Sequence, residues 1–205
     1  MIRIKICGIT NLDDAVAAQN LGADAVGFIF YQKSKRYISP ENAKYIINSL
    51  NPFIAKVGVF VNESKENVGH IAKSVGLTHV QLHGNESVKY ARSLLMPVIR
   101  AFNFSELKHV RLDDWQDFSV LIDSGSSSNP GGTGQTFPWQ ELVKEIQNTP
   151  FILAGGLNPE NVLDAIKIAK PIAVDVSSGV ELEYGKKSIE KIKQFIDKVK
   201  LSESI

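Results

Sequence analysis

Short apolar runs rich in β-branched residues recur along the chain, separated by segments with helical spacing of apolar residues. The runs predict eight strands, at residues 2–7, 24–30, 54–61, 78–83, 97–102, 119–123, 151–155 and 172–177. Several of the intervening segments open with Ser-Pro, Asn-Pro or another N-capping residue, as helices do. The segment after the fifth strand, 103–118, has the weakest helical pattern, and a helix is not required there.

Eight strands alternating with about eight helices within 205 residues have the repeat of an α/β barrel. We therefore predict a single (β/α)8, or TIM, barrel of eight parallel strands that spans 1–205 as one catalytic domain. The alternative is an open doubly wound sheet, whose phosphate loop follows the first strand with the spacing G-x-G-x-x-G. The turn after the first predicted strand reads "CGITN" and lacks that spacing.

Composition narrows the class of protein. Apolar residues make up 43% of the chain and charged residues 22%, which is ordinary for a globular protein. The formal net charge of +1 gives no reason to expect a nucleic acid or a membrane as partner. The opening "MIRIKIC" places charges inside an apolar run, so we expect no signal peptide. With Cys7 as the only cysteine, no internal disulfide can form, and we expect a cytoplasmic protein.

Polar residues gather toward the ends of the predicted strands. Because side chains alternate between the two faces of a strand, Arg3, Lys5 and Cys7 share one face of the first strand. We expect that face to point into the barrel, with Cys7 nearest its C-terminal mouth. Positions at or near the ends of later strands hold His83, Asp123 and Asp175.

Two interpretations of these residues are open at this point. Active sites of (β/α)8 barrels lie at the C-terminal ends of the strands, which favours a chemical role. In the structural interpretation, Lys5 and Asp175 form an ion network inside the barrel, and Cys7 is a small buried apolar residue.

Glycine-rich stretches follow the last three predicted strands, at 131–137, 154–162 and 175–181. Glycines let backbone N–H groups approach an anion closely, and barrels often bind phosphate with the loops after strands seven and eight. The sequence therefore predicts a phosphate-bearing substrate. After the second strand, "KSKRYISP" (33–40) adds Arg36, whose guanidinium suits a second anionic group, either carboxylate or phosphate.

Several motifs together resemble those of the phosphoribosylanthranilate isomerases of tryptophan biosynthesis. They run in order from residue 2 to about 187 and read "KICGIT", "ADAVGFIFYQKSKRYISPENA", "KVGVFVN", "VQLHGNE", "GGTGQTFPW", "AGGLNPENV" and "VDVSSGVE". The resemblance implies a (β/α)8 barrel that catalyses an Amadori rearrangement without metal or other cofactor. The substrate would be N-(5-phosphoribosyl)anthranilate, and the product 1-(2-carboxyphenylamino)-1-deoxyribulose 5-phosphate.

The resemblance also implies roles for single residues. The general base falls on Cys7 and the general acid on Asp123, while Arg36 would contact the anthranilate carboxylate. The loops at Gly155–Gly156 and Ser178–Gly179 would hold the phosphate. For His83 two roles are open, positioning the substrate or pairing with Gln81 or Asp175 in the barrel wall. Asp175 is a further candidate for substrate binding.

This chemistry places demands on the acid and the base. A free thiol has a pKa of about 8.5, so a base at Cys7 benefits from positive charge, which Lys5 or a helix N-terminus near Thr10 or Asn11 would supply. An aspartate is normally ionised at neutral pH, so an acid at Asp123 needs the apolar surroundings that "SVLID" suggests.

Two other functions are compatible with such a barrel. The isomerase that rearranges an aminoaldose in histidine biosynthesis would have a carboxylate in place of Cys7 and phosphate sites in both barrel halves. A non-catalytic phosphosugar-binding barrel would have no need of Cys7 and Asp123 together. The expected partner in each case is a small phosphosugar, and the protein is expected to be a monomer or a homodimer.

Overall fold

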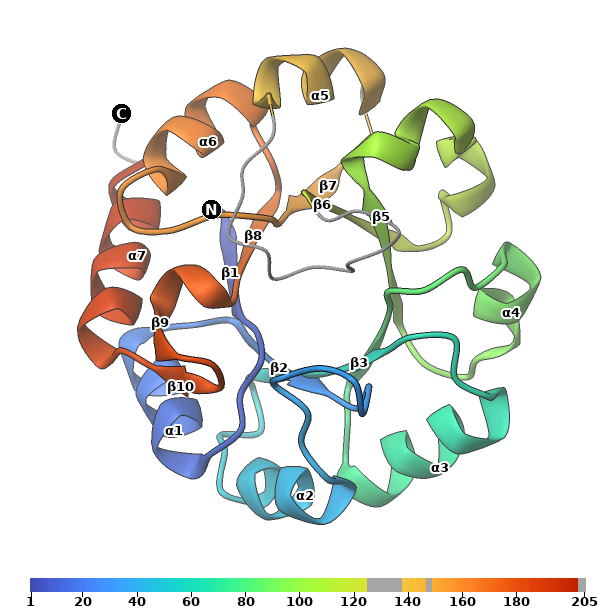
Figure 1. Cartoon of the computed structure of the whole chain (residues 1–205), viewed down its shortest axis with the longest axis vertical. Helices are drawn as coiled ribbons and strands as arrows, with labels where there is room; N and C mark the ends of the chain where they lie inside the picture. The colour runs from blue at the N-terminus through green and yellow to red at the C-terminus, as the bar shows by residue number, and fades with distance from the viewer. Residues whose placement is uncertain (125–137, 147–148, 203–205) are drawn as a thin grey trace.

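The computed structural model describes residues 1–124, 138–146 and 149–202. Its centre is a closed barrel of parallel strands that pair in chain order, with β8 returning to β1 (Figure 1). The strands are β1 (Arg3–Ile6), β2 (Ala25–Ile29), β3 (Ala55–Phe60), β4 (His79–Leu82), β5 (Val98–Asn103), β6 (Ser119–Asp123), β7 (Phe151–Leu153) and β8 (Ala173–Val176). The predicted eight-stranded (β/α)8 barrel is confirmed.

Helices surround the barrel on its outside (Figure 1). They are α1 (Leu12–Leu21), α2 (Pro40–Asn48), α3 (Lys65–Val75), α4 (Val88–Ser93), α5 (Trp139–Ile146), α6 (Val162–Ala169) and α7 (Ile189–Leu201). After β5 the chain forms two 3-10 helices, η1 (Phe104–His109) and η2 (Leu112–Trp115), where the sequence required no α-helix. Within the described ranges, none of the helices has the length and apolar character needed to cross a membrane.

After β8 the chain makes a short excursion before its last helix. The 3-10 helix η3 (Ser178–Val180) leads into an antiparallel pair of short strands, β9 (Glu181–Glu183) and β10 (Lys186–Lys187). The pair lies beside α1 and the start of α7 (Figure 1). It extends the loop that follows β8 and places charged side chains next to the barrel mouth.

Local sequence explains where the helices begin. The side chains of Asn11, Ser39, Ser64 and Ser87 each accept a hydrogen bond from a backbone N–H in the first turn of the helix that follows. Such caps satisfy N–H groups that have no partner within the helix. The helices that follow these strands therefore begin at defined residues.

The apolar core has two parts. The larger part fills the space between the barrel and its helices, and Ile4 and Ile6 of β1 belong to it. The smaller part contains residues of β3, β5 and β6, together with a residue that follows β7: Val57, Ile99, Ala101, Leu121 and Ala154. By the alternation of the strands these residues point inward, so the barrel interior beside β3, β5 and β6 is packed and apolar.

One prediction about the side chains that point into the barrel is wrong. Arg3 was expected to share the inner face with Lys5 and Cys7, but its side chain is 64% exposed and forms an ion pair with Asp24 at 2.8 Å. Arg3 is the first residue of β1 and lies at the N-terminal end of the barrel. A charged group there reaches water, and its ion pair needs no burial.

Candidate active site

A cavity opens at the C-terminal ends of the strands. Most of the predicted site residues line it, namely Cys7, Arg36, His83, Asp123, Gly155, Gly156, Asp175 and Ser178. Gly179 is not among these lining residues, but it packs against Leu157, which is one of them. A Cβ added at Gly179 would lie 1.9 Å from the carbonyl oxygen of Leu157, so only glycine lets the loop after β8 pack on the loop after β7.

Cys7 follows β1 directly, and a backbone hydrogen bond joins it to β8, the strand that pairs with β1 to close the barrel. Its N–H donates to the carbonyl oxygen of Val176 at 2.8 Å, which ties it to the end of β8. Its side chain is buried against Gly27 of β2, where an added Cβ would lie 2.7 Å from Sγ and 3.1 Å from Cε of Lys5. The absence of a side chain at Gly27 therefore makes room for the thiol inside the mouth.

Lys5 and Asp175 set the charge beneath Cys7. They are partners across β1 and β8, and Nζ of Lys5 lies 2.8 Å from Oδ2 of Asp175, with both side chains buried. Burial alone would lower the pKa of Lys5, but the negative charge of Asp175 and the hydrogen bond to it raise that pKa, so Lys5 is an ammonium ion. The predicted positive charge is thus in place.

The thiol itself is harder to ionise than the sequence suggested. Burial raises the pKa of Cys7, and the charge of Asp175 adds to that rise. Lys5 and Lys187 act in the opposite direction and do not outweigh burial. The predicted effect of Lys5 is therefore real, but the net result is a thiol rather than a thiolate near neutral pH.

His83 and Asp123 face each other from the ends of β4 and β6. The distance from His83 Nε2 to Asp123 Oδ2 is 3.9 Å, too long for a hydrogen bond. On its other side, His83 Nδ1 lies 3.1 Å from the amide nitrogen of Gln81, which is one of the two partners the sequence left open. Burial lowers the pKa of His83 despite the charge of Asp123, so the imidazole is neutral at pH 7.

Arg36 is held at the rim by a residue that the sequence analysis did not single out. Its Nε and Nη2 donate to Oε1 and Oε2 of Glu181, both at 2.8 Å, and both side chains are buried. The two lysines of the same segment do not join it at the mouth. Lys33 lines a different pocket, and Lys35 lies over the ring of Tyr184, with Nζ 4.1 Å from its centre.

Backbone geometry supports an anion site after β7 and β8. Gly155 and Gly156 have φ angles of +83° and +65°, in the left-handed region that residues other than glycine rarely adopt. Within the described part of the chain, the N–H groups of Gly155, Gly156 and Ser178 have no acceptor. Backbone N–H groups arranged in this way form a concave site for an anion such as phosphate. The third glycine-rich stretch, 131–137, lies outside the described residues.

Three buried polar atoms of described residues that line the cavity lack a hydrogen-bond partner among the described residues. They are Oε1 of Gln81, Nε2 of His83 and Oδ1 of Asp175. Buried polar groups are almost always satisfied, so such atoms in a cavity mark positions for groups of a ligand. Among the described residues, no three His, Cys, Asp or Glu side chains come together as a metal site would require.

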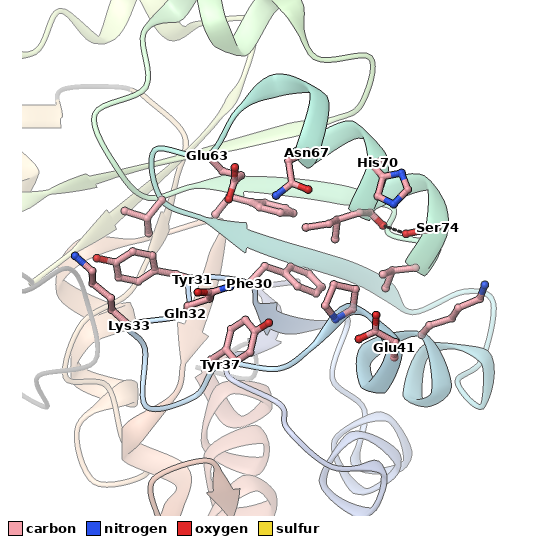
Figure 2. Close-up of a pocket in the computed structure, with 16 residues that line it drawn as sticks. Phe30, Tyr31, Gln32, Lys33, Tyr37, Glu41, Glu63, Asn67, His70 and Ser74 are labelled. Atoms are coloured by element: carbon pink, nitrogen blue, oxygen red, sulfur yellow. Dashed lines mark hydrogen bonds between the residues drawn. The ribbon is translucent and has the colours of Figure 1, made fainter.

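A wider pocket lies outside the mouth, between the segment after β2 and helix α3 (Figure 2). Glu63, Asn67 and His70 line it on one side, and Gln32 and Tyr37 on the other. None of the predicted catalytic or phosphate-binding residues reaches it. We take the smaller cavity at the mouth as the active site because the ionisable side chains and the N–H groups of the loops after β7 and β8 converge there.

Comparison with known proteins identifies the family of this chain. The family model described as N-(5'phosphoribosyl)anthranilate (PRA) isomerase matches residues 4–198. A curated protein named N-(5'-phosphoribosyl)anthranilate isomerase, from Thermotoga neapolitana, is 50% identical over 204 residues, covering 98% of this chain and 99% of its own.

Two solved structures add the fold and a ligand. The crystal structure of phosphoribosyl anthranilate isomerase from Thermotoga maritima superposes with a TM-score of 0.90 at 47% identity, covering 98% of this chain and 99% of that one. A second structure, with a TM-score of 0.87 at 46% identity and the same coverage, is described as a complex with reduced 1-(o-carboxyphenylamino)-1-deoxyribulose 5-phosphate.

Proposed function

Because this chain belongs to the N-(5'-phosphoribosyl)anthranilate isomerase family, we propose that Cys7 and Asp123 perform the acid–base steps of that reaction. The protein is the isomerase of tryptophan biosynthesis that converts N-(5'-phosphoribosyl)anthranilate, an aminoaldose, into 1-(2-carboxyphenylamino)-1-deoxyribulose 5-phosphate, an aminoketose. The reaction moves protons within one molecule, so an acid and a base on opposite sides of one sugar meet its needs.

The proposed sequence of steps begins at Asp123. Its carboxyl group donates a proton to the ring oxygen of the ribose, and the ring opens to a Schiff base between C1 and the anthranilate nitrogen. The thiolate of Cys7 then removes the proton from C2, and the electrons of that C–H bond form the C1–C2 double bond of an enolamine. Tautomerisation of the enolamine gives the ketone at C2. Asp123 is buried at the end of β6.

The order of the strands supports this assignment. Going round the closed barrel from β6 to β2, the mouth presents Asp123, then the two anion-binding loops, then Cys7 and finally Arg36. A phosphate held after β7 and β8 therefore sits between the acid and the base, and the sugar attached to it lies between their side chains. This placement of Cys7 and Asp123 on either side of one phosphate site carries the proposal.

The binding roles follow from the unsatisfied groups. We assign the phosphate to the N–H groups of the loops at Gly155–Gly156 and Ser178–Gly179, and the anthranilate carboxylate to Arg36. His83 Nε2 and Asp175 Oδ1 lack partners among the described residues and are suited to the hydroxyl groups of the ribose. With the Gln81 amide nitrogen donating to Nδ1 of His83, the ring proton lies on Nε2, which makes that atom a donor to the sugar.

The test separates binding from chemistry. We expect Asp123→Asn and the Cys7→Ala/Asp123→Asn double variant to bind the reduced product within ~3-fold of the parent, while kcat falls ~100-fold or more for the single variant. Titration calorimetry and a turnover assay measure the two properties. Unchanged turnover in folded Asp123→Asn would remove that residue from the chemistry. An inactive parent that still binds the reduced product would indicate a binding protein instead.

Two features of the setting stay predictions. The lone cysteine and the biosynthetic reaction favour a cytoplasmic enzyme, which cell fractionation with an antibody to the chain would check. The protein is expected to be a monomer or a homodimer, and light scattering across a dilution series would distinguish the two.

A further inference from the structure

The pair of short strands after β8 carries a buried charge cluster that the reaction chemistry does not itself require. Glu181 opens β9 and Lys187 closes β10, and both side chains are almost completely buried. They lie close to Arg36, which is far from them in the sequence and belongs to the loop after β2. Burying three charges at a surface loop costs desolvation energy, so their arrangement calls for an explanation.

Glu181 uses only one edge of the Arg36 guanidinium. Its two carboxylate oxygens accept from Nε and Nη2, each at 2.8 Å, which is the side-on arrangement of an arginine–carboxylate pair. The planar guanidinium has a second edge, formed by Nη1 and the other proton of Nη2. Within the described residues no acceptor takes that edge, and Arg36 lines the cavity. A ligand carboxylate fits it in the same two-bond manner.

Lys187 connects this pair to the phosphate loop. Its Nζ donates to Oε1 of Glu181 at 2.8 Å, to the carbonyl oxygen of Ser177 at 3.1 Å and to Oγ of Ser177 at 3.4 Å. The three protons of the ammonium group are therefore all engaged, and its side chain has no exposed surface. Ser177 directly precedes Ser178, whose N–H belongs to the proposed phosphate site.

Both cations of the cluster favour an ionised Glu181, although burial and the charge of Arg36 lower the pKa of Lys187. Burial would raise the pKa of Glu181, but hydrogen bonds and charge from Arg36 and Lys187 lower it, so the carboxylate is ionised across the working pH range. The backbone adds further ties. The N–H of Lys187 donates to Asp14 of α1 at 2.8 Å, and Nζ of Lys191 in α7 donates to the carbonyl oxygen of Glu181 at 2.9 Å. The cluster is thus anchored to the helices that flank it.

We propose that Glu181 and Lys187 are positioning residues, which hold the second edge of the Arg36 guanidinium at a fixed distance from the phosphate loop. The site would then select substrates by the distance between the carboxylate and the phosphate of the substrate. The proposal rests on the assignment of Arg36 to the ring carboxylate. A lone arginine would reach a carboxylate in many rotamers. Clamped by Glu181 and braced through Lys187 on Ser177, it presents one geometry, and binding then requires less ordering of the side chain.

The experiment compares two inhibitors in the isomerase reaction. One is reduced 1-(o-carboxyphenylamino)-1-deoxyribulose 5-phosphate, and the other is the same molecule without the ring carboxylate. The variants are Arg36→Met and Glu181→Gln, with Glu183→Gln as matched control, because Glu183 lies on the same short strand with its side chain 72% exposed. Inhibition constants, kcat, KM and the melting temperature are measured for each.

For Glu181→Gln we expect the carboxylate-bearing inhibitor to weaken by ~10-fold or more and the other inhibitor to change by less than ~3-fold. The substitution weakens the contacts of Glu181 with Arg36 and Lys187, whereas the N–H groups assigned to the phosphate are unchanged. KM should rise more than kcat falls. Arg36→Met should abolish the preference for the carboxylate, and Glu183→Gln should leave both constants at parent values. Lys187→Met should show the same carboxylate-selective loss, and it provides the test if Glu181→Gln does not fold.

Two results would overturn separate claims. If Arg36→Met keeps the preference for the carboxylate, the assignment of Arg36 is wrong. If Arg36→Met loses the preference but Glu181→Gln keeps it, or weakens both inhibitors equally, Glu181 has a structural role only and the positioning proposal is wrong.

Discussion

A single buried carboxylate, Glu86, joins three segments near the mouth, and replacing it tests how the loops are held. Oε2 of Glu86 accepts from Nη1 of Arg100 and from the N–H of Gly84, both at 2.9 Å, and Oε1 accepts from the N–H of Asn62 at 2.6 Å. These partners belong to β5 and to the loops after β4 and β3. Gly84 is the neighbour of His83, so the same carboxylate helps to place a candidate binding residue.

The structure sets the size of the effect. In Glu86→Gln the side chain keeps its shape but loses its charge, so Arg100 becomes a buried cation without its ion-pair partner. Breaking a buried pair in this way costs about 3–5 kcal/mol. One amide N–H would also face a backbone donor, which adds to the cost. For a domain of this length, each kcal/mol corresponds to about 2–4 °C in melting temperature, so we expect a fall of roughly 6–20 °C.

Thermal unfolding followed by circular dichroism measures this, with Asp117→Asn as control. The Arg92–Asp117 pair has a similar length, 3.1 Å, but both side chains are more than half exposed, so its loss should cost under about 1 kcal/mol. The double variant Glu86→Gln/Arg100→Met should recover part of the stability, because it removes the stranded charge. A melting temperature for Glu86→Gln within about 3 °C of the parent would refute the reasoning.

Three further predictions concern the site. Gly27→Ala places a methyl group 2.7 Å from Sγ of Cys7, so kcat should fall ~10-fold or more. The control Gly69→Ala, on α3, meets nothing within 4 Å, so it should leave kcat unchanged and add ~0.5–1 kcal/mol of stability. Equal kcat values for the two variants would contradict this. Burial raises the pKa of Cys7, and the thiolate fraction grows about tenfold per pH unit below that pKa, so kcat/KM should rise from pH 6 toward alkaline pH. A kcat/KM that does not change with pH above pH 6 would show that the base ionises more easily. Since the proposed steps are proton transfers between side chains and substrate, turnover should survive dialysis against a chelator, and a loss restored by added metal ion would refute the cofactor-free mechanism.

The fold was accessible from the sequence because strand alternation and helix caps are local signals. The sixth strand was predicted at 119–123 and is observed as Ser119–Asp123. The seventh was predicted to reach residue 155 but ends at Leu153, since the left-handed conformation of Gly155 and Gly156 turns the chain away from the sheet. Deviations of this kind arise where backbone conformation, rather than side-chain pattern, decides the boundary.

The placement of the site residues was also accessible, because every parallel strand of a barrel ends at the same face. What the sequence did not reveal is which charges pair there. Glu181 lies 145 positions from Arg36, and nothing local to either residue indicates their contact. The direction of the Cys7 pKa shift was hidden for a related reason, because it is a balance between burial and several charges that only the folded chain brings together.

The central claim is that Cys7 is the base of the isomerisation. The measurement that tests it most directly is turnover of freshly generated N-(5'-phosphoribosyl)anthranilate, followed by loss of its fluorescence, with the parent and Cys7→Ala side by side. We predict rapid turnover by the parent and a kcat lower by ~100- to 10,000-fold in a folded Cys7→Ala protein. Turnover retained in Cys7→Ala would contradict the claim and leave Cys7 as a packing residue.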